Sequence, residues 1–309
     1  MYGRTRKEIA QRPNMAIAER DAGLVFDAKN LSLSEYLNPW LDTIRGALAP
    51  NTVRRYEELT RINIKPVLGK TELSKLDPLR VQLFYRSKLD EGLSAATVVK
   101  VHSTLSKSLK QAVRWRLIPL NVCESVTPPR IARTKILPLD ARQIKALLKA
   151  AEGTDLQALW VLLATTGLRI GEALALRWDD LDLEARILRV NRTVFRNVVS
   201  QPKTKRSRRT IKLSELAIGA IRQHPRTADL VFCTGSGKPI NPGNLRNRSW
   251  KRLLGCAGLS QSTRLHDIRH STATLLLSRG VPIKVVSEML GHADAGTTLS
   301  VYAHVLPDM

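Results

Sequence analysis

The sequence predicts a mainly α-helical protein that contains a small antiparallel β-sheet and is divided into two domains. Its 309 residues exceed what a single hydrophobic core usually serves. Over most of the chain, apolar residues recur at helical spacing. One stretch differs: I-L-R-V-N-R-T-V-F at 187–195 alternates with period two, and a turn separates two further strand-like runs in S-Q-P-K-T-K-R-S-R-R-T-I-K-L at 200–213.

The expected division is a basic N-terminal segment at 1–28, a helical domain at 29–118, a linker at 119–138 and a second domain at 139–309. The linker is inferred from four prolines, at 119, 128, 129 and 138, in a stretch without periodicity and with a basic flank. Residues 5–12 of the first segment suggest a short helix.

Four helices are expected in the first domain. Ser32 and Glu35 have the spacing of a capping box, so the first helix begins there. The second begins near A-P-N-T-V-R-R-Y at 49–56, the third runs from Pro78 to Glu91 and stops at Gly92, and the fourth opens at Ser94.

The fourth helix carries a basic stripe beside its apolar one. Lys100, Lys107, Lys110 and Arg114 are spaced by seven, three and four residues, so they share one face and are expected to contact DNA phosphates. The alternative is a solvated face that happens to lack acidic residues.

The second domain opens with a helix capped by Asp140. Another, A-L-W-V-L-L-A-T-T, ends at Gly167, and helices resume after the turn-rich C-T-G-S-G-K-P-I-N-P-G-N at 233–244.

Charge points to a polyanionic partner. The chain has 50 Lys and Arg against 27 Asp and Glu, a net charge of +23, divided almost evenly between its halves. The alternative is a trait of solubility or ribosome association. Three scattered cysteines argue against a disulfide framework or a structural zinc site. With no long apolar run and no signal peptide, we expect no membrane partner and a cytoplasmic, nucleoid-associated location.

The residue types favour phosphodiester chemistry based on arginine. Clustered carboxylates that would hold metal ions are absent apart from W-D-D-L-D-L-E at 178–184, which resembles a solvated turn. Arginine stays charged and grips phosphate oxygens with two donors. In L-H-D-I-R-H at 265–270, His266 and Arg269 are three residues apart and share a helix face, so both could reach one phosphate.

Four ordered motifs resemble the signatures of the tyrosine recombinase, or phage integrase, family. They are A-T-T-G-L-R-I-G-E-A-L-A-L-R-W, P-K-T-K-R-S-R-R-T-I, L-H-D-I-R-H-S-T-A and M-L-G-H-A-D-A-G-T-T-L-S-V-Y-A-H. The resemblance covers about residues 31–309 and is most like phage or conjugative-element integrases. It implies a helical core-site-binding domain followed by a mixed α/β catalytic domain, with residues 1–28 as a possible remnant of an arm-binding domain.

The resemblance also implies roles for single residues. Arg169 and Arg269 match the two catalytic arginines, and Glu172 would support Arg169. His266 would accept the tyrosine proton or bond a phosphate oxygen, His292 would bond the phosphate, and Tyr302 would be the nucleophile. Lys203 matches the general acid, with Lys205 as its competitor. The remaining residues of the basic run, Lys205, Arg206, Arg208 and Arg209, are interpreted as phosphate or groove contacts, and His270 as structural.

The implied reaction is site-specific DNA recombination through a 3′-phosphotyrosyl intermediate, with no metal or cofactor. The implied partners are double-stranded DNA and a homotetramer that spans two sites, with accessory DNA-bending or directionality proteins. Three alternatives stay open: a type IB topoisomerase, a noncatalytic DNA-binding regulator in which Tyr302 is a core residue, and a metal-dependent nuclease or transposase.

Overall fold

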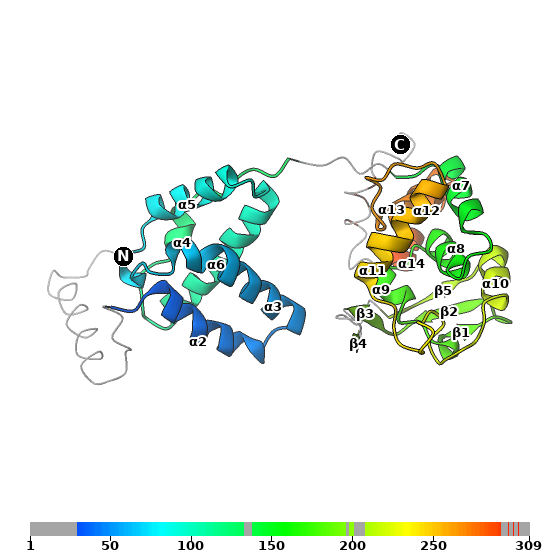
Figure 1. The fold of residues 1–309 in the computed structure, drawn as a ribbon, viewed down its shortest axis with the longest axis horizontal. Helices are drawn as coiled ribbons and strands as arrows, with labels where there is room; N and C mark the ends of the chain where they lie inside the picture. The colour runs from blue at the N-terminus through cyan, green and yellow to red at the C-terminus, as the bar shows by residue number, and fades with distance from the viewer. Residues whose placement is uncertain are drawn as a thin grey trace, which may run out of the picture. The chain divides into compact units, whose positions relative to one another are not determined.

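The computed structural model describes residues 30–132, 138–195, 198–200 and 208–291, together with Gly296, Leu299 and Tyr302. Contacts divide the chain between Arg133 and Thr134 into an N-terminal and a C-terminal unit. The N-terminal unit is helical, and the C-terminal unit combines helices with small antiparallel sheets (Figure 1). This confirms the predicted fold class. Among the described helices, none has the length and apolarity needed to cross a membrane.

The N-terminal unit contains the four expected helical regions. The described α-helices of this unit are α2 (Leu33–Arg45), α3 (Pro50–Leu59), α4 (Lys65–Leu68), α5 (Pro78–Asp90) and α6 (Ala95–Arg114). The capping box is present, because the Ser32 side chain accepts from the Glu35 amide and the Glu35 carboxylate accepts from Ser32 N. Ser94 caps α6 by accepting from Thr97 N. These local signals are sufficient to place the helix starts.

The core of this unit is built from the apolar faces of α2, α5 and α6, with Tyr36 and Trp40 among its fully buried side chains. A 3₁₀ turn at Val122–Ser125 adds Val122 and Cys123 to the same core. The expected linker at 119–138 therefore begins too early, because its first residues pack with the helical domain.

The C-terminal unit begins with the helix that Asp140 caps. Its described helices are α7 (Ala141–Ala151), α8 (Gln157–Thr166), α9 (Ile170–Ala173), α10 (Glu215–Arg222), α11 (Pro242–Asn244), α12 (Lys251–Cys256), α13 (Asp267–Ser278) and α14 (Ile283–Leu290). A π-helical segment, Leu245–Trp250, joins α11 to α12.

Two small antiparallel sheets accompany these helices. The first has the order β1-β2-β5, formed by Leu181–Asp182, Ile187–Val190 and Arg209–Lys212, with Leu188 opposite Ile211. The second pairs β3 (Thr193–Phe195) with β4 (Val198–Ser200). Figure 1 shows α7, α8 and α13 gathered on one side of the three-stranded sheet. The helix α8 is buried nearly all round, and Trp160 on it meets Trp250 at 5.7 Å between ring centroids.

The acidic segment at 178–184 differs from the expected solvated turn. Asp180 is 3% exposed, and its carboxylate accepts from Arg192 Nη1 at 2.8 Å, from Asn191 Nδ2 and from the Arg177 amide. The sequence could not show this, because a buried carboxylate requires a partner whose approach depends on the fold. Asp180 is a structural anchor next to β1.

Candidate active site

Arg169 lies between α8 and α9, in a turn that two glycines make possible. Gly167 ends α8 in the left-handed conformation with φ of 61°, and an added Cβ would come within 2.8 Å of the Leu290 side chain. A Cβ on Gly171 would lie 2.6 Å from the Val194 carbonyl oxygen. The motif G-L-R-I-G-E therefore brings α9 against β3 and the end of α14, with Arg169 as the N-cap residue of α9.

Glu172 is the buried anion of the site. Its carboxylate accepts from Arg169 Nη1 at 2.9 Å and from Arg209 Nη1 and Nη2 at 3.1 and 2.8 Å. Burial would raise the pKa of Glu172, but the hydrogen bonds and charges of Arg209 and Arg169 outweigh it and lower this pKa below its usual value. Glu172 thus stays ionised and fixes two guanidinium groups.

Arg209 does not have the DNA contact that the basic run suggested. Its side chain is 7% exposed, and besides Glu172 it donates from Nε to the Met289 carbonyl at 2.7 Å. The guanidinium also lies against Gly291, where an added Cβ would approach Nη1 to 2.9 Å. The expectation was wrong for this residue, because the alternation of β5 turns Arg209 inward. Its neighbour Arg208 is exposed.

Arg269 lies in the first turn of α13 and is only 3% exposed. Nη1 donates to the Gly167 carbonyl at 2.8 Å and Nη2 to the Leu290 carbonyl at 2.6 Å. Burial, followed by the charge of Arg169, lowers the pKa of Arg269 to about 9. The group therefore remains a cation at neutral pH, in a setting where water screens its charge weakly.

Three arginines meet at the C-terminal end of α14. Arg209 donates to Met289, Arg269 to Leu290, and Arg169 to Leu290 at 3.5 Å and to Gly291 at 3.3 Å. The last carbonyls of a helix lack intrahelical partners and carry partial negative charge, so cations stabilise this end. The three guanidinium groups are thereby held close together at this helix end.

His266 is the N-cap residue of α13 and is exposed on one side. Its ring meets that of His270 edge-on, with 4.9 Å between centroids. Packing around the ring, together with His270, Arg269 and Arg169, lowers the pKa of His266 to about 4. The imidazole is therefore neutral at pH 7.

Tyr302 reaches the site despite being 2% exposed. Its ring packs in a small cluster with Leu277, Val286 and Leu290 from α13 and α14. Its hydroxyl lies 2.6 Å from Nδ1 of His270. Burial raises the pKa of Tyr302 to about 12, and the charge of Arg269 opposes that rise.

His270 has a contact that the sequence interpretation does not include. The sequence favours a structural role for it, because it follows Arg269 directly and so points elsewhere on the helix. The structure brings it to Tyr302, which is 32 residues further along the chain. The available signal was its four-residue spacing from His266, which places the two histidines on one helix face.

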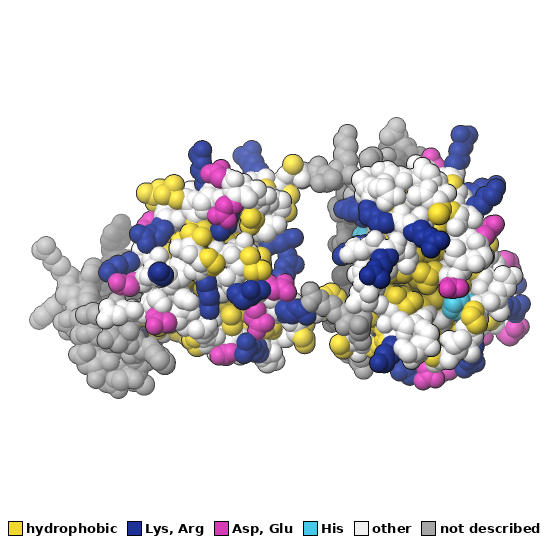
Figure 2. All heavy atoms as spheres, in the orientation of Figure 1, with side chains coloured by type: hydrophobic (Ala, Val, Ile, Leu, Met, Phe, Trp, Pro, Cys, Tyr) yellow, Lys and Arg dark blue, Asp and Glu magenta, His cyan; other side chains and the backbone are white. Residues whose placement is uncertain are grey.

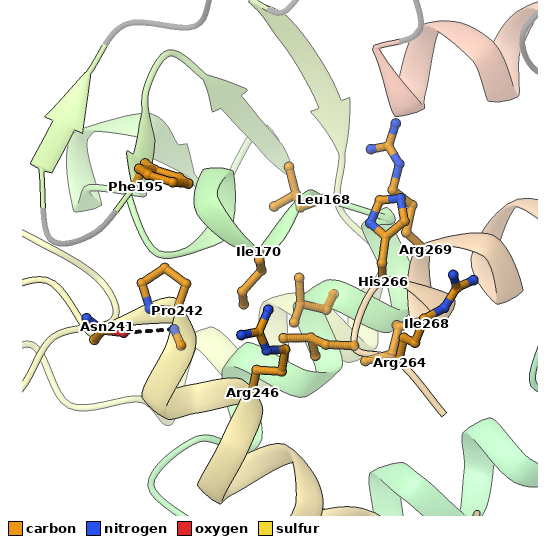
Figure 3. Close-up of a pocket in the computed structure, with 13 residues that line it drawn as sticks. Leu168, Ile170, Phe195, Asn241, Pro242, Arg246, Arg264, His266, Ile268 and Arg269 are labelled. Carbon is orange, nitrogen blue, oxygen red and sulfur yellow. Dashed lines mark hydrogen bonds between the residues drawn. The ribbon is translucent and has the colours of Figure 1, made fainter. Parts of the chain in front are cut away.

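A cavity of about 900 Å³ opens beside these residues. Figure 3 shows His266 and Arg269 side by side at one end of it, and Arg246 and Arg264 below them. Arg264 is fixed by Asp267, whose Oδ1 lies 2.7 Å from Nη2. Phe195 and Pro242 line the opposite end. Leu163, Leu168, Ile170 and Ile268 also line it, so the lining is largely apolar, with a cationic rim at Arg246 and Arg264.

The structure places Arg169, Glu172, Arg269, His266 and Tyr302 in one region of the C-terminal unit. Lys203, Lys205, Arg206 and His292 lie outside the described residues. In the N-terminal unit, the basic stripe of α6 is exposed along its whole length, at Lys100, Lys107, Lys110 and Arg114. Figure 2 shows Lys and Arg side chains over the visible face of both units.

A tyrosine hydroxyl gathered with arginines and histidines, in a unit of helices and small antiparallel sheets, is the arrangement expected of a tyrosine-dependent strand transferase. Residues 138–309 match the phage integrase family model, and residues 32–89 match the N-terminal SAM-like domain of phage integrases. The chain belongs to the phage integrase family and is a site-specific DNA recombinase.

Individual relatives agree with this assignment. A tyrosine recombinase XerC-like protein of Caldanaerobacter subterraneus subsp. tengcongensis is 30% identical, over 99% of this chain and 88% of the relative. The Tn1549 transposon integrase in complex with a circular intermediate DNA has the same fold, with a TM-score of 0.79 at 22% identity over 89% of this chain and 95% of that one. The structure of a lambda integrase tetramer bound to a Holliday junction has a TM-score of 0.73 at 18% identity, over 100% of this chain and 90% of that one.

Proposed function

We propose that the Tyr302 hydroxyl attacks a scissile DNA phosphate and forms a 3′-phosphotyrosyl bond, releasing a 5′ hydroxyl. A 5′ hydroxyl of the partner strand then attacks this bond and restores the tyrosine. The observation that supports this most is the contact of the Tyr302 hydroxyl with α13, the helix that carries both His266 and Arg269. Because the phosphate bond is exchanged and never hydrolysed, the cycle conserves its energy.

The arginines stabilise negative charge on the phosphate. Arg169 and Arg269 offset the negative charge that builds on the phosphate oxygens in the transition state. Their orientation is set in advance by Glu172 and by the carbonyls at the end of α14. In this proposal His266 and His292 bond nonbridging oxygens, and Lys203 protonates the leaving 5′ oxygen, with Lys205 as the alternative acid.

DNA would contact both units of the protein. The exposed basic residues of α6 share one helix face, so they can contact backbone phosphates together. In the C-terminal unit, the rim formed by Arg246 and Arg264 lies next to His266, where flanking phosphates would pass. Arg208 and the basic residues that precede it in the sequence, Lys205 and Arg206, would add further phosphate contacts.

The solved relatives suggest the assembly and the setting. The lambda integrase acts in that structure as a tetramer on a Holliday junction, and the Tn1549 integrase belongs to a transposon. We extend both features to this chain: a tetramer on two DNA sites, serving a mobile element and working on DNA in the cytoplasm.

The test uses a DNA site with a nick close to the cleavage point, so that the released fragment diffuses away and the covalent complex is trapped. Wild-type protein should form an adduct that survives denaturation, and Tyr302→Phe should form none. Absence of an adduct from wild type on its own site would refute the proposal and favour a noncatalytic regulator.

A second arm distinguishes recombination from topoisomerase activity. The recombinase should convert paired sites to exchanged products with a dependence on both sites. Relaxation of plasmids that lack a site would instead indicate a type IB topoisomerase. The same adduct assay with Lys203→Ala and Lys205→Ala assigns the general acid.

A further inference from the structure

His270 occupies a position that none of the proposed roles uses. It is half-buried on α13, one residue after Arg269 and four after His266. Its Nδ1 lies 2.6 Å from the Tyr302 hydroxyl oxygen, and the two rings are tilted by 54° with 5.8 Å between centroids. This is hydrogen-bond distance to the atom that would attack the phosphate.

We propose that His270 is the general base that takes the phenolic proton from Tyr302 during DNA cleavage, an inference that rests on the proposed phosphotyrosyl function. The hydroxyl donates its hydrogen bond to the Nδ1 lone pair, with the ring proton on Nε2. As the phenolic oxygen bonds to phosphorus, its O–H bond breaks and an N–H bond forms on His270. The P–O5′ bond breaks, and the leaving oxygen takes a proton from the general acid. In the return step, His270 gives its proton back to the departing phenolate.

The electrostatic setting of His270 suits a proton acceptor. Burial lowers the pKa of His270 below its ordinary value; Asp267 opposes this, while Arg264 and Arg269 reinforce it. Within the described part of the chain, the other titratable groups that face the ring are His266, whose own pKa is lowered, and the Tyr302 hydroxyl. The imidazole is therefore neutral at pH 7, and its lone pair is available to accept a proton.

Tyr302 has a corresponding need for a base. Burial raises its pKa to about 12, so at pH 7 only about one molecule in 100,000 carries the phenolate. Free phenolate is too rare to support cleavage by itself, and proton removal must accompany the attack. A base already in contact with the hydroxyl meets this need without any rearrangement of α13.

The two histidines of α13 then have separate tasks. Figure 3 shows the His266 side chain at the end of the cavity, alongside Arg269. That position suits a contact with a phosphate oxygen. His270 instead faces the cluster that holds the Tyr302 ring. The proton of the nucleophile and the charge of the phosphate are thus handled by different imidazoles one helical turn apart.

The test compares His270→Asn with wild type in single-turnover cleavage of the nicked site. Asparagine places an amide where Nδ1 lies, so it keeps a hydrogen bond to Tyr302 but takes no proton at neutral pH. Two substrates are used, one with the natural 5′ oxygen at the scissile phosphate and one with a bridging 5′ sulfur, which leaves without protonation.

We expect His270→Asn to slow adduct formation by about 100-fold or more on both substrates, the usual scale for loss of a general base. Its DNA affinity and melting temperature should stay near wild type. The sulfur substrate should restore the cleavage rate of a variant that lacks the general acid. It should not restore the cleavage rate of His270→Asn. In wild type the rate should fall on the acid side as His270 becomes protonated, and the variant should lose this limb of the pH profile.

Three outcomes would overturn the assignment: cleavage by His270→Asn within about threefold of wild type, repair of its defect by the sulfur substrate, or an unchanged acid limb. If the asparagine variant does not fold, His270→Ala with added imidazole replaces it. Saturable rescue by neutral imidazole supports the base, and absence of rescue in a folded variant rejects it. Adduct formation by wild type tests the phosphotyrosyl function separately, so the two failures are distinguishable.

Discussion

Removing Arg209 tests whether this buried arginine organises the site through Glu172. In Arg209→Met, Glu172 loses two charged hydrogen bonds but keeps those from the Arg169 side chain and amide. Loss of one partner of a buried ion pair costs roughly 3–5 kcal/mol. Because Arg169 partly compensates, we expect the lower end, about 3 kcal/mol off the free energy of unfolding of the C-terminal unit.

The pH dependence of this loss has a defined sign. In wild type the pKa of Glu172 is lowered, so its contribution to stability is present above the unfolded pKa of about 4.3 and is lost as pH falls through the lower folded value. Without Arg209, burial dominates and raises this pKa. The variant then gains stability as pH falls from 7 toward about 4.3. The difference in free energy of unfolding between wild type and variant therefore becomes smaller.

The assay is urea unfolding of the full chain followed by tryptophan fluorescence, at pH 7 and pH 5. Trp160 and Trp250 report on the C-terminal core, while Trp40 lies in the other unit. The matched control is Arg222→Met, whose partner Glu184 lies 2.8 Å away but whose side chain is 56% exposed. Such a surface pair contributes below about 1 kcal/mol.

Adding Glu172→Gln to Arg209→Met should recover part of the lost stability, because position 172 no longer carries a buried carboxylate that has lost its Arg209 partner. Cleavage should still be slow in the double variant, since Arg169 has lost the carboxylate that orients it. The reasoning is refuted if Arg209→Met costs no more than Arg222→Met, or if its cost grows as pH falls.

Three further predictions concern other parts of the protein. Gly291→Ala should lower the melting temperature and the cleavage rate more than Gly280→Ala. Both glycines have positive φ, but only at position 291 does the new Cβ meet Arg209. Equal effects of the two substitutions would contradict this contact. Each alanine replacement of Lys100, Lys107 or Lys110 should reduce the slope of log affinity against log salt concentration by about 0.9. The control Lys75→Ala, which removes the partner of Glu72, should leave this slope unchanged. An unaltered slope in the three α6 variants rejects the α6 contact. The ring carbons of His266 should titrate in NMR near pH 4 in the DNA-free protein, and a midpoint at 6 or above would contradict its packing beside the arginines.

Much of the fold was predictable because its signals are local. The caps at Ser32, Ser94 and Asp140 and the left-handed glycine at 167 depend on residues within one helical turn. Alternation at 187–195 predicted strands, but the structure divides that run between β2 and β3, which belong to different sheets. Domain limits were less accurate, since the packing of Val122 and Cys123 against the helical core leaves no periodic trace in the sequence.

The candidate site also combines features that the sequence predicts with features that depend on long-range packing. By itself the sequence determined the family and the expected chemistry, because Arg169, His266, Arg269 and Tyr302 stand in ordered motifs whose residue types are suited to bind a phosphate and attack it. Only the tertiary structure decided how these groups are held: Arg209 turned inward to Glu172, and His270 met a tyrosine 32 residues away. The physical reason is that burial and long-range hydrogen bonds depend on which surfaces meet, and neighbours along the chain do not specify that.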